Sequence, residues 1–366
     1  MKNIELQEFV PKKIETKSGN KEYSLQINKS KQKVLVANTK DKHKNFYRRR
    51  YVTVPHNSLC IWYGWPAGRN QSSAVNNGSR YKYFIMPEKL PLDKITLNAL
   101  GLLQAEMTKH TKRASSIIFS NSNPTLITLV MDFFKRFEIH ENDWSWNITF
   151  NYKLKNFENL SDTQKREKKS LEYWLKNTNI NLGSKRNKFM LYGGNKKYKN
   201  FDKETVRGGT LVICHSNIIL YQLILEILSR INELLIDEGK TAYFLQGLIA
   251  GDGSLKFTPT GSIDNVNIGA IELKEKKLIV SYLKNIGIKS SFSKGDKNTV
   301  RIFNRKNFFK IYEYGLFDLH KERKHRFLKG LTRFKYSSSD ISIKENLFRI
   351  QKNINEVEMN GYYQMV

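Results

Sequence analysis

Two acidic residues, Glu106 and Asp252, occupy the same place in two short segments that are otherwise apolar or small. The segments read ALGLLQAEM over residues 99–107 and LQGLIAGDG over residues 245–253. Small residues stand at the third and seventh positions of both segments, namely Gly101 and Ala105 in the first and Gly247 and Gly251 in the second. Small residues four apart share one helix face and let two backbones approach closely. The spacing therefore predicts two helices that pack together through these four positions.

Helices packed in this way would place the two carboxylates side by side at their C-terminal ends. That placement is unfavourable, because like charges repel and a helix C-terminus is itself negative. A divalent cation relieves both problems, and Mg²⁺ takes one or two carboxylates while it keeps waters and accepts phosphate oxygens. A core helix that contains glycine and ends in an acid is common on its own. Two such helices in corresponding places indicate metal-assisted phosphodiester hydrolysis.

The charge of the chain agrees with a phosphate-bearing partner. The 366 residues include 63 Lys and Arg against 34 Asp and Glu, a formal net charge of +29. A surplus of this size favours a polyanion, nucleic acid before membrane. Hydrophobic residues make up 39% of the chain, which is enough for real cores and argues against wholesale disorder. Charge alone does not distinguish cutting, modifying and holding the partner.

Other kinds of site are disfavoured. Cys60 and Cys214 are the only cysteines, so a disulfide framework and a cysteine-based zinc site are both excluded. The seven histidines are scattered, and none forms an HExxH pair. The first residues lack the apolar core of a signal peptide, and no apolar stretch is long enough to span a bilayer. We expect a reducing compartment that contains nucleic acid, the cytoplasm or an organellar matrix, and no membrane association.

Hydrophobic periodicity predicts two repeats of the same supersecondary unit. In the first we expect helices at 97–109, 124–137, 160–178 and 217–235 and strands at 115–120, 145–153 and 209–215, with a loop over 182–209. In the second we expect helices at 243–253, 274–286, 306–314 and 321–334 and strands at 254–258, 266–273, 290–294 and 299–304. Read as helix–strand–strand–helix–strand–strand–helix twice, the order implies two similar domains related by a pseudo-two-fold axis.

The ends of the chain are less regular. Residues 1–94 are basic, with short β-like runs such as 33–36 and 81–85, turn signals at 65–68 and 76–78, and the basic run Arg48-Arg49-Arg50. This segment is either an ordered, β-rich extension or a solvated tail, and the interleaved aromatic residues favour the first. Residues 336–366 form a C-terminal tail whose apolar spacing hints at a helix.

With these motifs and this order, the sequence resembles the LAGLIDADG homing endonucleases in their single-chain form with two motifs. The resemblance covers residues 95–332, and the motif at 245–253 matches closely, whereas Met107 replaces the closing glycine and Gln104 an acid in the other motif. It implies an α+β fold of two pseudo-symmetric αββαββα domains, 95–240 with an insertion around 158–208 and 241–335, with antiparallel saddle sheets on DNA. The segments 1–94 and 336–366 would be additions to it.

The resemblance also implies a reaction and its residues. A monomer would cut both strands of a long DNA target for intron homing and leave short 3′ overhangs. Glu106 and Asp252, with the backbone carbonyls of Ala105 and Gly251, would hold roughly two or three Mg²⁺ ions, for which Mn²⁺ substitutes. Lys109 and Lys274, which the resemblance places near the scissile phosphates, would stabilise charge there, or else make ordinary backbone contacts. Lys256 is a weaker rival for this role.

Target recognition would come from polar strand faces. In the first repeat, residues alternate along 145–153, so that Ser145, Asn147, Thr149, Asn151 and Lys153 face away from Trp146 and its apolar neighbours. In the second repeat the corresponding outward set is Lys256, Thr258, Arg301 and Arg305. Such side chains suit base edges in a major groove, over a site of roughly twenty base pairs. An ordinary solvent-facing strand would look the same.

Two other functions stay open. An RNA-binding intron maturase would have the same charge, and a non-catalytic DNA-binding regulator could keep the same fold. The presence of both motif acids favours cleavage, since a regulator would be expected to lose one. The chain neither begins with Cys or Ser nor ends in His-Asn, so we expect a free-standing or intron-encoded protein rather than an intein.

Overall fold

The computed structural model divides the chain into two compact units. Unit 1 comprises residues 1–96 and 107–234, and unit 2 comprises residues 97–106 and 235–366. The structure describes residues 3–11, 13–14, 23–40, 47–64, 82–107, 116–151, 160–178, 188–192, 208–292, 298–334, 348–352 and 354. Within these residues, no helix combines the length and the apolar character that a membrane span requires. The helix that carries Glu106 thus belongs to the unit that also carries Asp252.

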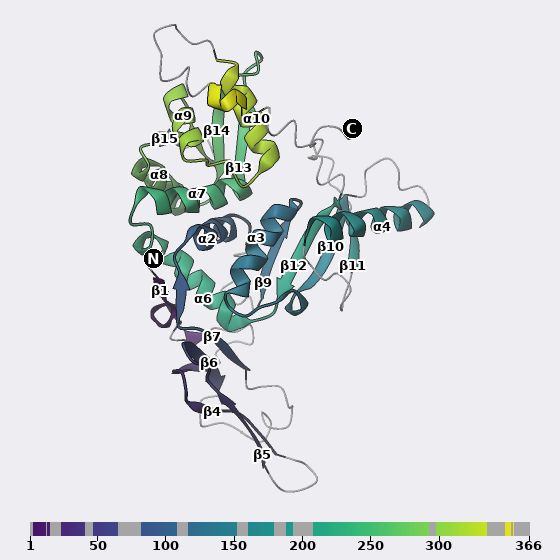
Figure 1. The fold of residues 1–366 in the computed structure, drawn as a ribbon, viewed down its shortest axis with the longest axis vertical. Helices are drawn as coiled ribbons and strands as arrows, with labels where there is room; N and C mark the ends of the chain where they lie inside the picture. Colours follow the sequence, from purple (N-terminus) through teal and green to yellow (C-terminus); the bar gives the residue numbers. More distant parts are fainter. Residues whose placement is uncertain are drawn as a thin grey trace. The chain divides into compact units, whose positions relative to one another are not determined.

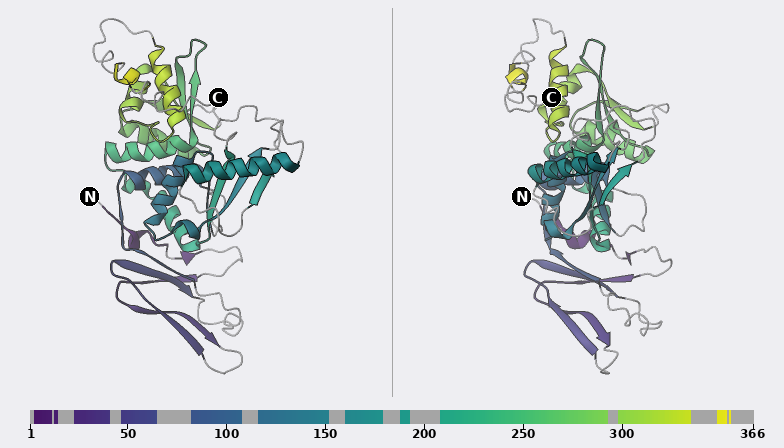
Figure 2. Two further views of the ribbon diagram at one scale, coloured as in Figure 1. Left: turned by 45° about the vertical axis from the view of Figure 1, so that its right-hand side comes forward. Right: turned by 90° about the vertical axis from the view of Figure 1, so that its right-hand side faces the viewer.

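The N-terminal part of unit 1 is made of short antiparallel strands, which agrees with the β-like runs in its sequence (Figure 2). Its elements are β1 (Asn3–Glu5), η1 (Leu6–Phe9), β2 (Lys13–Ile14), β3 (Tyr23–Asn28), β4 (Lys33–Lys40), β5 (Tyr47–Thr53), β6 (Ser58–Gly64), β7 (Lys82–Pro87) and β8 (Lys89–Pro91). They form a sheet of order β2-β3-β6-β7 and the pairs β4-β5 and β1-β8. The basic run Arg48–Arg50 lies in β5. The turn signals at 65–68 and 76–78 lie outside the described residues.

The rest of unit 1 is a four-stranded sheet with helices (Figure 1). Its elements are β9 (Ile117–Asn121), α3 (Pro124–Lys135), η2 (Glu141–Asp143), β10 (Ser145–Asn151), α4 (Leu160–Asn177), β11 (Lys188–Tyr192), β12 (Thr210–His215), α6 (Ile218–Ser229) and η3 (Ile231–Glu233). The strand order is β11-β10-β12-β9. Helix α3 begins as the sequence predicts, because Asn123 caps it through its side chain and Pro124 suits a first turn.

The predicted loop over 182–209 is wrong in part. Residues 188–192 form β11, which pairs with β10 in parallel, while β10-β12 and β12-β9 are antiparallel as expected. A parallel neighbour needs a crossover, and α4 provides it between the two strands. The carbonyl oxygen of Gly208, after β11, accepts hydrogen bonds from Ser170 Oγ at 2.5 Å and Trp174 Nε1 at 2.8 Å on α4.

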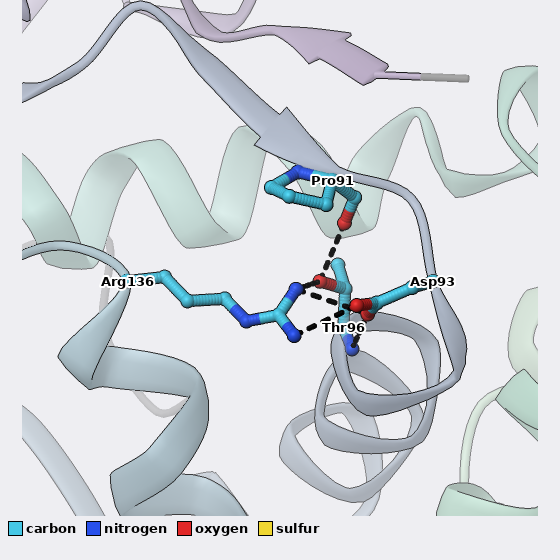
Figure 3. Close-up of polar contacts among 4 residues, drawn as sticks. All are labelled: Pro91, Asp93, Thr96 and Arg136. Atoms are coloured by element: carbon cyan, nitrogen blue, oxygen red, sulfur yellow. Dashed lines mark hydrogen bonds and ion pairs between the residues drawn. The ribbon is translucent and has the colours of Figure 1, made fainter. Parts of the chain in front are cut away.

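Helix α2 (Lys94–Glu106) begins at a charged clamp in unit 1 (Figure 3). Asp93 Oδ1 accepts from the backbone N–H of Thr96 at 2.9 Å, as an N-cap does. Arg136, just after α3, donates to both carboxylate oxygens of Asp93 at 2.9 and 2.8 Å and to Thr96 Oγ1 at 2.7 Å. Thr96 Oγ1 in turn donates to the carbonyl of Pro91 at 2.7 Å. The first turn of the helix is therefore fixed by four residues of unit 1.

Unit 2 contains the rest of α2 together with an αββαββαα series (Figure 1). The series is α7 (Glu238–Asp252), β13 (Gly253–Phe257), β14 (Ile263–Gly269), α8 (Leu273–Asn285), β15 (Ser290–Ser291), β16 (Thr299–Ile302), α9 (Arg305–Glu313) and α10 (Lys321–Thr332). Of the tail, residues 348–352 and 354 are described, and 348–352 are helical. All pairings in the sheet of order β13-β14-β16-β15 are antiparallel.

The sheet of unit 2 has one apolar and one polar face. Val266, Ile268, Val300 and Ile302 are buried, and α8 and α10 pack against these strands. The alternate residues of the same strands point to the opposite face, as the two-residue period of a strand requires. This alternation agrees with the expected sheet, whose core face is covered by helices and whose other face is polar.

The expected order of elements is confirmed in the second repeat and only partly visible in the first. The antiparallel strands β9-β12-β10 correspond in order and direction to β14-β16-β15. Between α2 and α3 the structure shows a single strand, β9, among its described residues, and residues 108–115 lie outside them. The strand predicted over 266–273 is displaced, because the chain leaves β14 at Gly269 and enters α8 at Leu273.

Candidate functional site

The two motif helices pack backbone to backbone at the predicted glycines. A Cβ on Gly101 would collide with the carbonyl oxygen of Phe244 and lie 2.9 Å from the N atom of Leu248. A Cβ on Gly247 would collide with the carbonyl oxygen of Asn98. Real side chains do not fit at such separations, so only glycine permits this approach of α2 and α7. The helix contact predicted from residue spacing is therefore present.

The close approach continues to the C-terminal ends of both helices. A Cβ on Gly251 would lie 2.6 Å from Cβ of Ala105 and 3.0 Å from Cγ of Glu106. Glu106 is the last residue of α2 and Asp252 the last residue of α7. Both carboxylates are half-buried. The packing thus brings the two motif acids together, as their positions in the sequence indicate.

The proximity of the two acids affects the pKa of Glu106. Burial and the negative charge of Asp252 raise the pKa of Glu106 to about 7, and the positive charge of Arg323 acts in the opposite direction. Burial has this effect because it disfavours the charged form, and a neighbouring carboxylate does the same. The site therefore holds more negative charge than it can easily accommodate, and a cation would be favourable there.

The donor set fits a hard divalent cation. Two carboxylates lie at the ends of helices whose last carbonyls, including those of Ala105 and Gly251, lack further turns to bond to. These are all oxygen donors, which Mg²⁺ prefers, and water and phosphate would complete the coordination. Among the described residues there is no group of three or more His, Cys, Asp or Glu side chains that could hold a metal.

Arg323 is part of the site, and the sequence did not reveal it. It lies on α10 and donates from Nη1 to the carbonyl oxygens of Ala250 at 2.8 Å, Ile249 at 3.0 Å and Gly251 at 3.3 Å. These are the carbonyls of the last turn of α7. Arg323 lies 71 positions after Asp252 in the sequence, and no motif marks it. The only available signal was its place in a strongly basic helix, which does not single out one residue.

A row of polar residues crosses the face of the unit 2 sheet that lies opposite its apolar face. Asn267 lies opposite Ser254 on one side and Arg301 on the other, and Arg301 lies opposite Ser291. Lys256 lies opposite Asn265, two residues further along the same face of the two strands. The Oδ1 atoms of Asn265 and Asn267 are buried and have no hydrogen-bond partner among the described residues. Of these, Lys256 and Arg301 were predicted. Asn265 precedes the predicted strand 266–273, and Asn267 lies within that strand but was not among the predicted contact residues.

Two residues of the predicted outward set lie elsewhere. Arg305 is not on the sheet but is the first residue of α9, where its guanidinium carbon lies 4.9 Å above the ring of Phe334. Thr258 follows the end of β13, and its hydroxyl lies 2.8 Å from the hydroxyl oxygens of Thr260 and Ser262. These positions follow from strands that end earlier than predicted.

The described part of the structure does not show either predicted lysine, Lys109 or Lys274, beside the two acids. Lys274 does not end a strand: it is the second residue of α8, and its side chain is exposed. Lys109 lies outside the described residues, as does Lys153. A catalytic role for either Lys109 or Lys274 stays a prediction.

The predicted face of the first repeat has the expected alternation. Trp146 and Ile148 in β10 are buried, while Ser145, Asn147 and Thr149 are half-buried on the other side. Asn151 is the last residue of β10, and its side chain is not described. Since β10 is an inner strand between β11 and β12, its polar residues are less exposed than those of an edge strand.

The fold and its paired acidic helices define the class of protein as α+β with small antiparallel sheets. No protein-family model and no curated protein matches the chain. Solved structures with a similar fold include the homing endonuclease I-DmoI in complex with DNA and Mn, at 12% identity and a TM-score of 0.36, over 62% of this chain and 98% of that one. Another is the N-terminal LAGLIDADG domain of DUF199/WhiA, at 12% identity and a TM-score of 0.32, over 62% of this chain and 85% of that one.

Full-length DUF199/WhiA from Thermatoga maritima is a third, at 12% identity and a TM-score of 0.34, over 72% of this chain and 69% of that one. One of these neighbours is described as a LAGLIDADG domain, the family that the two motifs resemble.

Proposed function

We propose that this protein is a site-specific DNA endonuclease that uses Mg²⁺ to cut both strands of a long target and leaves short 3′ overhangs. The observation that carries the proposal is the glycine-mediated contact that brings Glu106 and Asp252 together at the ends of α2 and α7. Two carboxylates held this close have no evident structural benefit, because burial and mutual repulsion both oppose their charged forms. A requirement for divalent cations explains why both are present.

Each group of the site has a role in this proposal. Glu106 and Asp252 bind the cations, with the carbonyl oxygens of Ala105 and Gly251 as further donors. Bound Mg²⁺ supplies an activated water and stabilises charge on the leaving 3′ oxygen. The glycine contacts fix the separation of the two carboxylates, and β13 begins at Gly253, directly after Asp252, so that this acid is held next to the sheet. In this proposal, Lys109 and Lys274 stabilise charge on the scissile phosphates. The alternative role for either lysine is an ordinary contact with a backbone phosphate.

The polar sheet faces are proposed to read the target. In unit 2 the cross-strand row that contains Asn267 and Arg301 offers amide and guanidinium groups, which pair with adenine and guanine edges respectively. Lys256 stands on the same face and is exposed, so that it suits a phosphate. In unit 1 the half-buried Ser145, Asn147 and Thr149 take the equivalent role.

The remaining attributes follow from the same proposal. A chain with a net charge of +29 would bind duplex DNA through many phosphates, with strong dependence on salt. It would act as a monomer, because both acids come from one chain. Intron homing, and the cytoplasm or an organellar matrix as the site of action, fit a nuclease of this kind. Intron RNA is the other polyanion that the charge would suit.

A second candidate is a DNA-binding protein of the same fold that does not cut. It is favoured by Arg323, which already brings a positive charge to the carbonyl of Gly251. A site with a built-in cation could stay folded without metal. In that case the acids would be structural and the polar sheet faces would carry the whole function.

The two candidates are separated by a cleavage assay. A supercoiled plasmid that carries the uninterrupted host locus is incubated with the wild-type protein and Mg²⁺, and the variants Glu106→Gln and Asp252→Asn are compared. We expect linear product from the wild type and none from either variant, with binding to the same DNA retained in all three. DNA binding without cleavage by the wild type would favour the non-catalytic protein, and retention of intron RNA without cutting would favour a maturase. Cutting by either variant at the wild-type rate would refute the assignment of the metal site.

A further inference from the structure

The guanidinium of Arg323, on α10, lies against the carbonyl oxygens of the last turn of α7. Arg323 Nη1 lies 2.8 to 3.3 Å from three successive carbonyl oxygens, those of Ile249, Ala250 and Gly251. The final carbonyls of a helix lack partners within it and carry its negative dipole end. A cation in this place therefore satisfies hydrogen bonds and opposes that dipole. Arg323 itself is half-buried, so its charge is less screened than that of a surface arginine.

The same guanidinium lies next to the acid pair. Gly251, whose carbonyl oxygen it contacts, packs against Glu106, because a Cβ on Gly251 would lie 3.0 Å from Cγ of Glu106. Asp252 directly follows the third carbonyl that Arg323 contacts, so the guanidinium closes the turn that carries this acid. Without Arg323, the two carboxylates and the C-terminus of α7 would lose the positive charge that this residue brings to them. A bound divalent cation would bring positive charge to the same place.

We propose that Arg323 is a positioning residue that serves as the internal counter-cation of the acid pair while no divalent cation is bound. It holds the last turn of α7, and with it Asp252 and the Gly251 carbonyl, in a conformation ready for the metal. This inference rests on the proposed function, because it assumes that a divalent cation shares the site. An arginine suits the role, since it stays charged at all relevant pH values and its planar fork donates several hydrogen bonds in a fixed geometry.

A testable consequence is that the guanidinium and the divalent cation partly replace each other. Both oppose the same negative charge, so removing one increases the stabilising effect of the other. A cap that acts only through its hydrogen bonds would not show this behaviour, because its loss would cost the same whether or not a cation or both acids were present. The coupling therefore separates a counter-cation from a simple helix cap.

Hydrogen–deuterium exchange of the full-length protein measures the effect locally. The backbone N–H of Gly253 bonds to the Ile249 carbonyl that Arg323 also contacts, so peptides over 249–253 report on the turn. In EDTA we expect Arg323→Met to exchange several-fold faster there than the wild type. Saturating Mg²⁺ or Mn²⁺ should restore most of the protection, and thus protect the variant more than the wild type. Arg326→Met is the matched control, because Arg326 lies on the same helix but stacks 5.4 Å from the ring of Phe257.

A second comparison, made in the Glu106→Gln variant, tests the role of Arg323 without any metal. Glu106→Gln removes one negative charge, so Arg323→Met should accelerate exchange less in this background than in the wild type, in EDTA. Arg323→Lys keeps the charge with fewer donors, and its exchange rate should fall between those of the wild type and Arg323→Met. It replaces Arg323→Met if that variant proves too unstable to study. Wild-type exchange in Arg323→Met, or an equal acceleration with and without Glu106, would overturn the proposal. If the wild type binds no divalent cation, the proposed nuclease function fails, while the comparison in EDTA still decides the role of Arg323.

Discussion

Asp252 raises the pKa of Glu106, in addition to the larger effect of burial, so that the carboxyl group of Glu106 reaches a pKa of about 7. The two residues are 146 positions apart in the sequence, and close packing of Gly251 against Ala105 and Glu106 brings them together. A raised pKa at an acid pair is typical of sites that bind or use cations. It also makes the site sensitive to pH in a range that is easy to measure.

The stability of the metal-free protein should fall as the pH rises from about 4.5 to about 7. The pKa of Glu106 is raised from 4.5 to about 7 in the folded protein, so in this window the folded state keeps a proton that the unfolded state has released. Stability falls with pH wherever the folded state binds more protons. Urea unfolding in EDTA at several pH values measures the effect. Glu106→Gln should remove this part of the slope, and an unchanged slope would mean that Glu106 does not titrate in this window.

Binding of Mg²⁺ or Mn²⁺ should strengthen with pH up to about 7 and then level off. The cation requires the ionised carboxylate, so below the pKa of Glu106 binding must release a proton. Affinity should fall by about tenfold for each pH unit below that pKa. Calorimetry in two buffers with different ionisation enthalpies reports the proton release directly. Equal apparent enthalpies in both buffers at pH 6 would contradict the prediction.

Residue spacing predicted the contact of the helices because that contact is made by backbone atoms. Gly101 and Gly247 leave no freedom in how α2 and α7 meet, and each helix then fixes the position of its terminal acid. Arg323 could not be predicted in this way. Its hydrogen bonds to α7 depend on how α10 packs in the three-dimensional fold, and a basic helix offers many equivalent residues to a sequence-based argument.

The strands likewise include features that the sequence predicts and features that depend on packing in the fold. The alternation of Trp146 and Ile148 with polar residues fixed both faces of β10, because a period of two is a strong local signal. Strand β14 has Val266 and Ile268 inward but ends at Gly269, and α8 begins at Leu273, so the predicted strand 266–273 continues beyond the observed one. The apolar Ile271 and Leu273, both largely exposed, continue the strand-like composition beyond the real strand. Composition therefore misplaced the boundary where packing no longer supported a strand.

Replacing either interface glycine should destabilise unit 2. A Cβ at Gly101 or Gly247 meets backbone atoms, which cannot move aside as a flexible side chain can. We expect Gly101→Ala or Gly247→Ala to cost about 3 kcal/mol or more, because overpacking against backbone forces the helices apart. Gly239→Ala is the matched control, since the nearest atom to its Cβ is a side-chain oxygen at 3.5 Å and alanine favours a helix. Denaturant unfolding measures all three, and a control as damaging as the interface variants would contradict the explanation.

The clamp at the start of α2 should make a measurable contribution to the stability of unit 1. Burial alone would raise the pKa of Asp93, but hydrogen bonds from Arg136 and Thr96 outweigh it and lower the pKa. This contribution is present above the usual pKa of an aspartate and is lost as the pH falls through the lowered value. Arg136→Met should cost roughly 1–3 kcal/mol at neutral pH, because it leaves a half-buried carboxylate without its partner.

A double-mutant cycle with Asp93→Asn isolates the energy of the clamp. If the two residues act through their mutual contact, the cost of Arg136→Met should shrink in the Asp93→Asn background. Additive costs in denaturant unfolding would instead mean that Arg136 stabilises the fold through its other contact, Thr96 Oγ1.

Asn267 and Lys256 should affect DNA binding in different ways. Asn267 stands in the centre of the polar row, and its buried carbonyl oxygen has no hydrogen-bond partner among the described residues, so that in the proposed function a base edge would supply this partner. Asn267→Ala should relax discrimination at one position of the target by roughly 1–3 kcal/mol. Lys256→Ala should weaken binding to all sequences equally and lower the salt slope by about one, as the loss of a phosphate contact does.

Lys284→Ala is the control, because it removes the same charge from an exposed position on α8, which packs against the apolar side of the sheet. Titration of the protein with single-base variants of its target, at several salt concentrations, distinguishes the three. Equal losses for Lys256→Ala and Lys284→Ala would mean that the polar face of this sheet is not where the DNA lies.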